Sequence, residues 1–412
     1  ISLYGADALR YTMADMATEL QDVRMPVDYR CPHCHSLTPQ TAVVPRHKRP
    51  ADVFQIKCSH CDEPFATQWA PEDLKVQLHV AYETSDRVEI GRNLCNKLWN
   101  AARFAFMNLE GVECKPLEAA ALLPEDRWIL AELSRITRQV NELMARYQFS
   151  ATVRTLREFF WDSLCDWYIE LTKPRMAADA PPSRRGVEAK QVLAFCLDQV
   201  LRMFHPFIPF ITERLWQQLN SVAPRRGLPG LADPPASDLL AIAEYPPETG
   251  WPGLDDPNVV RVFKDLQNAT RGIRDLRNKC KVPPKTRVAV TIKTPADRVE
   301  SLRSQAHVIR GMAAVETLNV VSQLKRPKNA ASTVIGGLQI LVHDISDDEA
   351  ERERVERELR NVQKQIIGKE SKLANERFVQ NARPEIVEAE RSRLTELHSQ
   401  RQALRQALDE LP

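Results

Sequence analysis

The sequence contains no long run of apolar residues and no excess of charge of either sign. No apolar run approaches the ~20 residues that a membrane-spanning helix needs, and the start of the chain lacks the organisation of a secretory signal. The 57 basic side chains nearly balance the 55 acidic ones, so the overall charge does not argue for a polyanionic partner. Any such argument must be local. We therefore expect a soluble, cytoplasmic protein of several folded units, since 412 residues exceed the usual size of one domain.

Nine cysteines are an odd number for a disulfide framework, and four of them form two CxxC pairs. The pairs lie in residues 25–72, a stretch that is rich in proline and basic residues and has no helical period. Two CxxC pairs are typical of a structural zinc site, in which four thiolates surround one ion as a tetrahedron. We therefore predict a zinc-ribbon-like insert that binds Zn²⁺ through Cys31, Cys34, Cys58 and Cys61.

Two alternatives to a zinc site stay open, a redox pair and a site that has lost its metal. His33, His35 and His60 are competing ligands, although four sulfurs already fill a closed site. Within the insert, three stretches predict short strands: residues 41–44, 53–57 and 65–69.

The helix predicted over residues 91–110 has two distinct faces. Leu94, Leu98 and Leu109 belong to an apolar stripe that must face a core. Asparagine is a poor helix former, yet asparagines and arginines share another side of this helix. These residues are Arg92, Asn96, Asn100 and Arg103. Either they bond to neighbouring helices and loops, or they form a surface for a hydrogen-bonding, negatively charged partner.

Further amphipathic helices follow, and with modest loops between them they predict an antiparallel bundle. They cover residues 128–147, 150–172 (ending before Lys173-Pro174), a stretch with its stripe at 192–203, and 212–219. Residues 223–258 are rich in proline and glycine and predict a long connection. The helix predicted over 259–281 carries the strongest local positive charge, including Arg271, Arg274, Arg277 and Lys279. A solvated face and a phosphate-binding face are both open for it.

After Val282-Pro283-Pro284 the period changes, and alternating stretches around one helix predict a small α/β unit. From residue 347 apolar residues recur at heptad spacing on both sides of Pro384. This pattern predicts a helical hairpin whose two arms form a short antiparallel coiled coil.

Several long phrases carry a family resemblance. They are GRNLCNKLWNAARFAFMNLEG, WDSLCDWYIELTKPR, MFHPFIPFITERLW, RNKCKVPP and KESKLANERFVQNARPEIVEAERSRL. In this order they resemble the C-terminal half of the valyl-tRNA synthetases, which are class I aminoacyl-tRNA synthetases. The fold class is then mainly α: an antiparallel anticodon-binding helix bundle with an inserted zinc ribbon, a small α/β unit and a C-terminal antiparallel coiled-coil hairpin.

The resemblance implies the following division of the chain. Residues 1–24 close the catalytic region, 25–72 form the inserted zinc-ribbon-like module, 73–283 the anticodon-binding bundle, 284–345 the small α/β linker domain and 346–412 the coiled-coil arm. Two departures matter. The cysteine-rich stretch interrupts a place where the family usually runs directly into the bundle, so its role does not carry over. No HIGH-like or KMSKS-like motif occurs in these residues, so we expect a non-catalytic fragment of a longer enzyme.

The full-length enzyme of such a family would attach valine to tRNA(Val) with ATP and Mg²⁺ and hydrolyse mischarged threonine, in domains outside these residues. The resemblance implies that the residues of this chain bind the tRNA. Its bundle would receive the anticodon through the residues of helices 91–110 and 259–281 named above, because unstacked bases can be read there. Its arm would lie on the outer corner of the tRNA, with Lys364, Lys369, Lys372 and Arg377 as phosphate contacts, although a solvated flank is equally open. We expect tRNA(Val) as partner, no DNA, no membrane and a monomer.

Two rival functions remain at this point. One is the corresponding part of another class I synthetase, such as the isoleucine or leucine enzyme. The other is a zinc-ribbon RNA- or protein-binding adaptor without a catalytic domain, which the balanced charge favours slightly.

Overall fold

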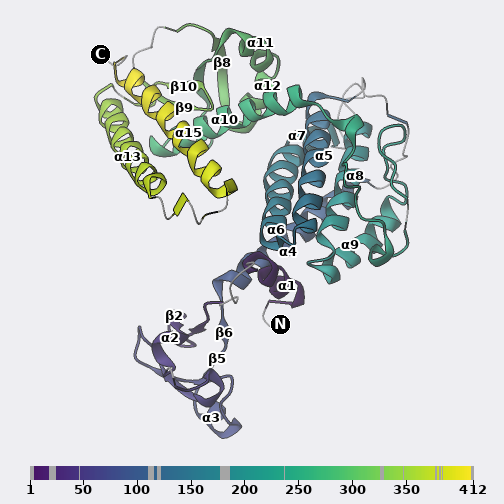
Figure 1. The fold of residues 1–412 in the computed structure, drawn as a ribbon, viewed down its shortest axis with the longest axis vertical. Helices are drawn as coiled ribbons and strands as arrows, with labels where there is room; N and C mark the ends of the chain where they lie inside the picture. Colours follow the sequence, from purple (N-terminus) through teal and green to yellow (C-terminus); the bar gives the residue numbers. More distant parts are fainter. Residues whose placement is uncertain are drawn as a thin grey trace. The chain divides into compact units, whose positions relative to one another are not determined.

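The computed structural model describes residues 4–17, 25–45, 47–109, 116–117, 122–176, 186–235, 237–324, 329–346, 348–375, 378–379, 382 and 384–409. The chain forms two compact units, Ile1–Asp256 and Pro257–Pro412 (Figure 1). Helices dominate both, and the described residues add three small sheets, so the prediction of a mainly α fold is confirmed. No helix in the described ranges is both long and apolar enough to cross a membrane.

The first unit is a helix bundle built around one buried helix. Its helices are α1 (Ala6–Met16), α4 (Asp86–Leu109), α5 (Pro124–Ala145), α6 (Phe149–Glu158), the π-helix η3 (Phe159–Ile169), α7 (Glu170–Met176), α8 (Val187–Phe204) and α9 (Pro209–Val222). Every residue of α8 from Gln191 to Phe204 is buried, and α8 packs against α4, α5, α6, α7 and α9. A helix that is buried all round must be the centre of its bundle. Residues of α4 and α5 that face neither α8 nor the other elements packed on these helices are left for solvent or a partner.

The helix predicted to end at Thr172 is longer than the sequence indicates. It runs from α6 through η3 into α7 and ends at Met176, so Lys173-Pro174 does not stop it. Pro174 lies inside α7, where its missing N–H removes one helical hydrogen bond and its ring crowds the preceding turn, yet the helix continues to Met176. Phe159–Ile169 has π rather than α geometry, a rare conformation for which the helical period gives no signal.

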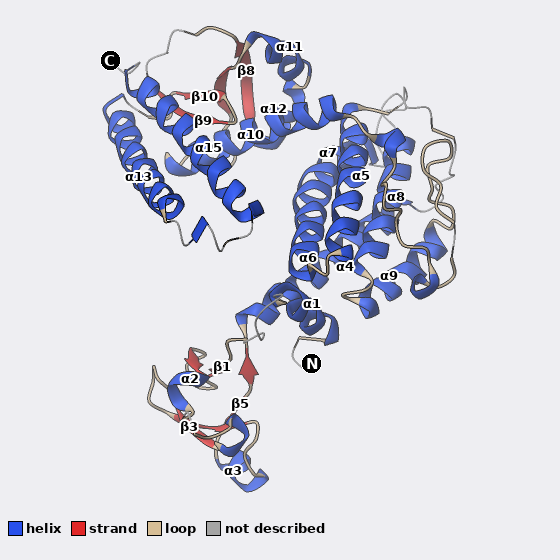
Figure 2. Cartoon of the chain, viewed as in Figure 1, coloured by secondary structure: helices blue, strands red, loops and turns tan. Residues whose placement is uncertain are grey.

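A buried ion cluster fixes the long connection after α9. The connection is mostly loop (Figure 2) and includes the short turns η5 (Leu240–Ile242) and η6 (Pro252–Leu254). The Asp198 carboxylate of α8 accepts hydrogen bonds from Arg202 (2.7 Å) and Arg226 (2.6 Å). Arg202 also donates to the carbonyls of Pro235 and Glu244, so one guanidinium ties two points of the connection to α8. Both guanidinium groups lie over the Trp216 ring. The predicted connection is thus a loop that is attached to the core of the bundle by these buried ion pairs and hydrogen bonds.

The cysteine module consists of two hairpins within the first unit. Its elements are β1 (Asp28–Arg30), β2 (Leu37–Pro39), α2 (Gln40–Val43), η1 (Pro50–Asp52), β3 (Gln55–Lys57), β4 (Pro64–Thr67), α3 (Glu72–Gln77), β5 (Val80–Ala81) and β6 (Glu83–Thr84). The sheets have the orders β2-β1-β6 and β3-β4-β5. The strands predicted near 53–57 and 65–69 are confirmed as β3 and β4. The strand predicted at 41–44 is wrong, because the turn of helix α2 follows Pro39 there and the first hairpin lies earlier, on either side of the first CxxC pair.

Helix α1 packs on α4 through Gly91, at a distance that excludes any side chain. A Cβ at Gly91 would lie 2.4 Å from the carbonyl oxygen of Ala8, which belongs to the backbone of α1 and cannot rotate away. We therefore expect Gly91→Ala to lower the unfolding free energy of the first unit by about 1–3 kcal/mol, measured by urea denaturation. Gly311→Ala is the matched control, because this helical glycine of α12 has open space around its Cβ position. That change should stabilise its own unit by about 0.5–1 kcal/mol, and a stabilising Gly91→Ala would contradict the close packing.

The second unit combines a mixed sheet, a long helix and a helical hairpin. Its elements are α10 (Pro257–Lys279), β7 (Val288–Lys293), α11 (Ala296–Ser304), α12 (Ala306–Ala313), β8 (Val315–Val321), β9 (Ala330–Ile335), β10 (Leu338–His343), α13 (Asp348–Ala374) and α15 (Pro384–Asp409). The sheet order is β8-β7-β10-β9, with β7 parallel to β8 and antiparallel to β10. Helix α10 packs on β9 and β10, and α12 packs on α10 and β8.

The predicted coiled-coil hairpin is present in the second unit. Helices α13 and α15 lie side by side (Figure 1) and share a core of the predicted heptad residues. Val355, Val362, Ile366, Leu397 and Leu404 are buried in it, flanked by Leu359, Leu394 and Leu408. Because both arms also contact β9, the base of the hairpin is anchored on the sheet.

Candidate metal centre and nucleic-acid interface

Each CxxC pair occupies the tip of one hairpin and folds into the same turn. In the first, the Cys31 N–H donates to Ser36 O and the His35 N–H to Cys31 O. In the second, the Cys58 N–H donates to Glu63 O and the Asp62 N–H to Cys58 O. His35 and Asp62, each four residues after the first cysteine of its pair, both have a positive φ, 60° and 63°. Two such turns point their thiols at one place, as structural zinc sites require.

The four sulfurs are spaced as a metal ion would hold them. All lie within 4.8 Å of one another, and the Sγ atoms are 3.7 Å apart both in Cys31–Cys61 and in Cys34–Cys58. A tetrahedron with zinc–sulfur bonds of about 2.3 Å has edges of about 3.8 Å. A disulfide needs sulfurs about 2.05 Å apart, so neither contact is one. This group can hold a metal ion with four sulfur ligands.

Hydrogen bonds at the cluster favour the thiolate form of Cys58. The backbone N–H groups of Cys61 and His60 lower the pKa of the Cys58 thiol to about 6, against the opposing effect of burial. The hydroxyl of Thr38 also donates toward Cys58 Sγ over 3.8 Å. Thiolates are the form that binds metal.

The histidines do not join the sulfur cluster among the described residues. The only ligand group found there contains the four cysteines. His33 instead contacts Pro64 O through Nε2 and lies with its ring edge-on to His79. We therefore take the four cysteine sulfurs, without a histidine, as the candidate metal ligands.

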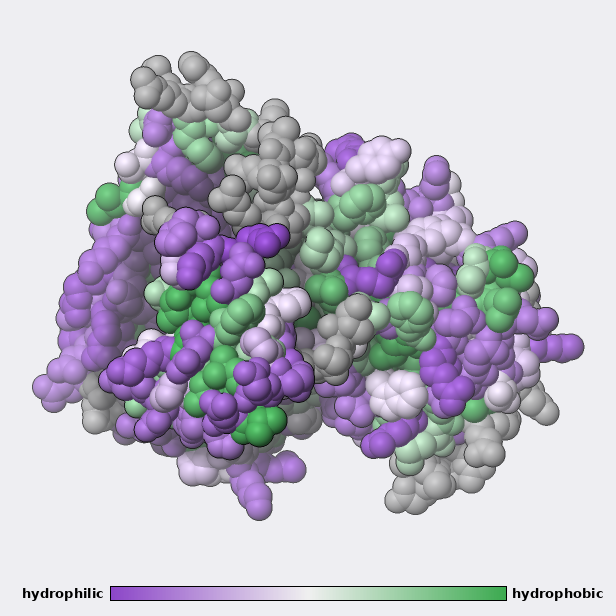
Figure 3. All heavy atoms as spheres, turned by 90° about the horizontal axis from the view of Figure 1, so that it is seen from below, coloured by the Kyte–Doolittle hydropathy of each residue, from purple (hydrophilic) through white to green (hydrophobic). Residues whose placement is uncertain are grey.

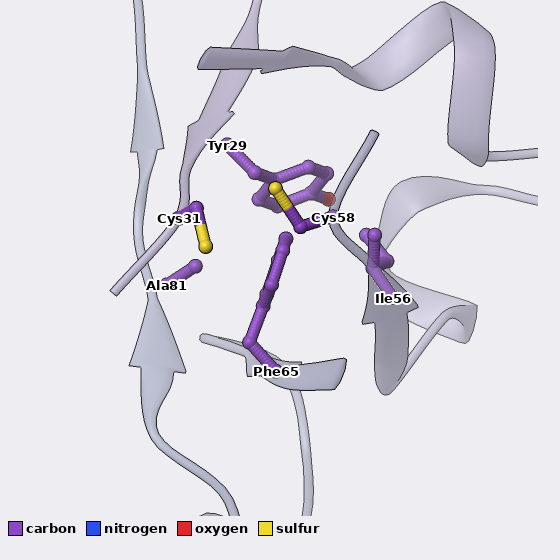
Figure 4. Packing of buried hydrophobic residues seen from close by; sticks show 6 residues of the cluster. All are labelled: Tyr29, Cys31, Ile56, Cys58, Phe65 and Ala81. Atoms are coloured by element: carbon purple, nitrogen blue, oxygen red, sulfur yellow. The ribbon is translucent and has the colours of Figure 1, made fainter. Parts of the chain in front are cut away.

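The core beneath the cysteines is small. Figure 4 shows Tyr29, Ile56, Phe65 and Ala81 converging on Cys31 and Cys58, and all six are buried. So few apolar side chains supply little folding free energy, which makes a bound metal important for the module.

The module is joined to the first long helix of the bundle by more than the peptide chain. Strand β6 pairs with β1, next to the first CxxC pair, and leads through Ser85 directly into α4. Arg30 forms an ion pair with Glu89 of α4 at 3.4 Å. Glu83 accepts hydrogen bonds from Gln40, Gln68 and Trp69. The order of the module is thus coupled to the start of α4.

The outer surface of the module mixes polar and apolar side chains. It faces the viewer in Figure 3, where hydrophobic patches lie among hydrophilic ones. Phe54, Trp69, Val76 and Tyr82 of the module are all exposed. A surface of this kind lacks the basic excess that RNA backbones attract, and by itself it does not favour RNA as the module's partner.

The polar face of α4 lies at the surface, as its sequence suggests. Asn96, Asn100 and Arg103 are exposed, whereas Arg92 is half-buried with its guanidinium 5.3 Å from the Tyr4 ring centroid. No hydrogen bond or ion pair joins Asn96, Asn100 or Arg103 to another described side chain. They form a free polar strip rather than internal contacts.

Trp99 lies on the same strip, although it is not among the residues predicted from the sequence. Its side chain is 39% exposed between Asn96 and Arg103, and Met107 continues the strip at 77% exposed. A large exposed aromatic beside free amides and a guanidinium suits the stacking and edge recognition of an unstacked base. The signal was available, because Trp99 falls outside the apolar stripe of this helix.

The basic residues of α10 divide into exposed and internally bound ones. Arg271 is exposed and forms no ion pair with a described residue, whereas Arg274 donates to Met312 O at 2.6 Å. Lys279 pairs with Asp275 at 2.8 Å. Arg277 is buried and donates to the carbonyls of Ala313, Ala314, Pro283 and Pro284. Arg277 therefore holds the turn after α10 in place and is left out of the proposed tRNA surface.

The predicted lysines of the arm also differ in their surroundings. Lys364 is exposed and has no ion pair within the described residues. Lys369 and Lys372 of α13 both bind Glu390 of α15, and the pKa of the Glu390 carboxyl is lowered by these two lysines. Arg377 lies outside the described residues. Two of the four predicted phosphate contacts thus also join the two arms.

Two family models match separate parts of the chain. The anticodon-binding domain of tRNA ligase matches residues 126–292, and the valyl tRNA synthetase tRNA binding arm matches residues 347–412. The second match covers the coiled-coil hairpin, and its model describes the synthetase of one amino acid, valine. The valine–tRNA ligase of Rhodopirellula baltica is 37% identical over 410 residues, which cover 98% of this chain and 38% of that protein. This chain belongs to the valine–tRNA ligase family.

Two further valine–tRNA ligases match less of the chain. The protein of Carboxydothermus hydrogenoformans is 35% identical over 78% of this chain and 35% of its own length, and that of Brucella suis is 37% identical over 74% and 32%. The chain therefore spans about a third of the length of these relatives, and it corresponds to their C-terminal regions. A match over 98% of the chain necessarily crosses the cysteine module, so the R. baltica protein is aligned with this part as well.

Proposed function

We propose that this chain is the tRNA-holding part of a valine–tRNA ligase and that it recognises tRNA(Val). The observation that carries the proposal is the presence, in one chain, of an anticodon-binding match and of the tRNA-binding arm of the valine family. The isoleucine and leucine enzymes are disfavoured by that arm. An adaptor without catalytic ancestry is disfavoured by the identity to valine–tRNA ligases along almost the whole chain.

In this proposal the whole enzyme attaches valine to tRNA(Val) with ATP and Mg²⁺ and hydrolyses mischarged threonine. Those reactions belong to parts of the enzyme other than the residues described here. The chain's own contribution is to bind and orient the tRNA, as a monomer in the cytoplasm, without DNA as a ligand. The cysteine cluster holds Zn²⁺, whose role is to fold the module and order the start of α4.

The polar strip of α4 reads the anticodon loop. The strip comprises Asn96, Trp99, Asn100 and Arg103. Trp99 stacks on an unstacked base, the two amides bond to base edges, and Arg103 meets the backbone or a base face. The support is that these side chains are exposed together on a rigid helix and have few contacts of their own.

Changing this strip should weaken binding of tRNA(Val) selectively. We expect Asn100→Ala combined with Arg103→Glu to lower the affinity of the chain for tRNA(Val) by about tenfold or more, since such contacts contribute about 1–3 kcal/mol each. The affinity for a tRNA(Val) transcript with altered anticodon bases should change much less, because that contact is already lost. Filter binding at fixed salt measures both.

The matched control is Arg310→Glu, which reverses an exposed charge on α12 of the second unit. It should leave the preference for the natural anticodon intact. If the wild-type chain binds all tRNAs equally, or if the α4 variant keeps the full preference, the anticodon assignment to this strip is wrong.

A further inference from the structure

The second unit contains a large groove that the proposed function has not used. It has a volume of about 1060 Å³ and lies between α10, the β9–β10 turn and α15. Lys264, Asn268 and Arg271 line it from α10, and Ser399 and Gln400 line it from α15. We call it the α10–α15 groove. One wall is α10, which packs on the sheet, and the other is α15, one arm of the coiled coil.

The floor of the groove is a tight turn made possible by glycine. Gly336 and Gly337 join β9 to β10 with positive φ values of 59° and 80°. A Cβ at Gly336 would lie 2.3 Å from Nδ2 of Asn268, so a side chain there would collide with the α10 wall. Glycine therefore lets this turn approach α10 closely.

Positive charge dominates the lining of the groove, although the chain as a whole is nearly neutral. Among the lining residues that the structure describes, four are cations: Lys264, Arg271, Lys293 and Arg393. The one carboxylate in this described lining, Glu396, is paired with Arg393 at 2.8 Å. Lys264 and Arg271 form no ion pair with any residue that the structure describes. A concave surface lined by one sign of charge concentrates an oppositely charged ligand.

The spacing and chemistry of the lining fit an extended ligand. Lys264 and Arg271 are seven residues apart on α10, which places them about 10 Å apart along one side of the helix. Between and opposite them lie neutral hydrogen-bonding groups from Asn268, Gln339 and Gln400. The lining offers repeated cations with amides between them, which suits an extended anionic ligand. A phosphodiester backbone presents anions at intervals with hydroxyls and base edges between them, which is the complementary pattern.

We propose that the α10–α15 groove binds the ribose-phosphate backbone of the tRNA and adds affinity without reading the anticodon. This inference rests on the proposed function and adds a second contact region, distinct in kind from the α4 strip. The arm that supplies one wall is fixed to the sheet, because Arg354 of α13 donates to the carbonyl of Ser332 on β9 and α15 also packs on β9. Affinity and specificity are then supplied by different parts of the chain.

The test is the double variant Lys264→Glu/Arg271→Glu, measured by filter binding with tRNA(Val) and with an anticodon-altered transcript at several salt concentrations. We expect both affinities to fall by a similar factor of at least tenfold, because the contacts are to the backbone. The slope of log affinity against log salt should become shallower by about 1.5, as expected when two phosphate contacts are lost. Arg271→Lys should retain most of the affinity.

The matched control is Lys285→Glu/Arg310→Glu, which makes the same charge change at two exposed cations outside the groove. If the groove variant binds like this control while the wild-type chain prefers tRNA(Val), the groove assignment is overturned and the proposed function stands. If the wild-type chain binds all tRNAs alike but the groove variant loses affinity, the anticodon proposal falls and the groove stands. If the wild-type chain binds no RNA, both fall.

Discussion

Replacing Asp198 by alanine is expected to lower the unfolding free energy of the first unit by about 3–5 kcal/mol. Arg202 and Arg226 both bind this carboxylate, and their side chains are only 3% and 5% exposed. Burial lowers the pKa of Arg226, with the Asp198 charge opposing that effect. Without Asp198, two cations would remain in the core beside Trp216 with no anion to balance them. Urea denaturation followed by circular dichroism measures the loss.

The control for this prediction is Asp166→Ala. Asp166 also pairs with a cation, Lys97, at 2.9 Å, but at the surface, where such a pair contributes at most about 1 kcal/mol. Asp198→Asn should fall between the two, because it keeps an acceptor and loses the charge. If Asp198→Ala costs no more than Asp166→Ala, the connection after α9 is not held in the way described.

Removal of zinc is expected to unfold the cysteine module while the helix bundle remains. The module's core comprises few side chains, and binding of a structural zinc ion supplies on the order of 10 kcal/mol. Treatment with a strong chelator should release about one zinc per chain and open residues 25–85 to proteases. The helical circular dichroism signal should change little, since most helical residues lie outside the module.

Cysteine variants make this result specific. Cys58→Ser should abolish stoichiometric zinc binding, whereas Cys280→Ser, at a cysteine outside the cluster, should not. Because β6 leads into α4, loss of zinc should also weaken tRNA(Val) binding, by less than the α4 variant does. Protein purified without chelator that holds no metal, yet protects the module from proteolysis, would contradict the zinc site.

The helical parts of the fold followed from the sequence because their periodicity is long and strong. The heptad residues of the hairpin, such as Val355 and Leu397, meet in one core as predicted. The predictions of short helices and strands were less accurate. Residues 41–44 were predicted to form a strand. Residues 41–43 instead belong to the helical turn α2, which follows Pro39 and the first hairpin. In a stretch of four residues, tertiary context outweighs intrinsic preference.

The candidate site was only partly predictable from the sequence. A helical pattern shows which residues lie on the same face of a helix, but it does not show which residues of other elements contact that face. The two CxxC pairs met as expected, since their spacing alone constrains them. Arg277 could not be recognised as buried, because its four carbonyl partners come from other segments up to 37 residues away. Lys369 and Lys372 likewise share Glu390, a partner on the opposite arm.

In the proposed complex this chain binds tRNA(Val) through the anticodon loop and the body of the tRNA. Hydroxyl-radical footprinting of tRNA(Val) bound to the wild-type chain tests this proposal. We expect protection of the anticodon loop and of backbone elsewhere. The loop protection should be lost in Asn100→Ala/Arg103→Glu, and the other protection should be reduced in Lys264→Glu/Arg271→Glu. A footprint that leaves the anticodon loop exposed in the wild-type complex would contradict the proposed binding mode.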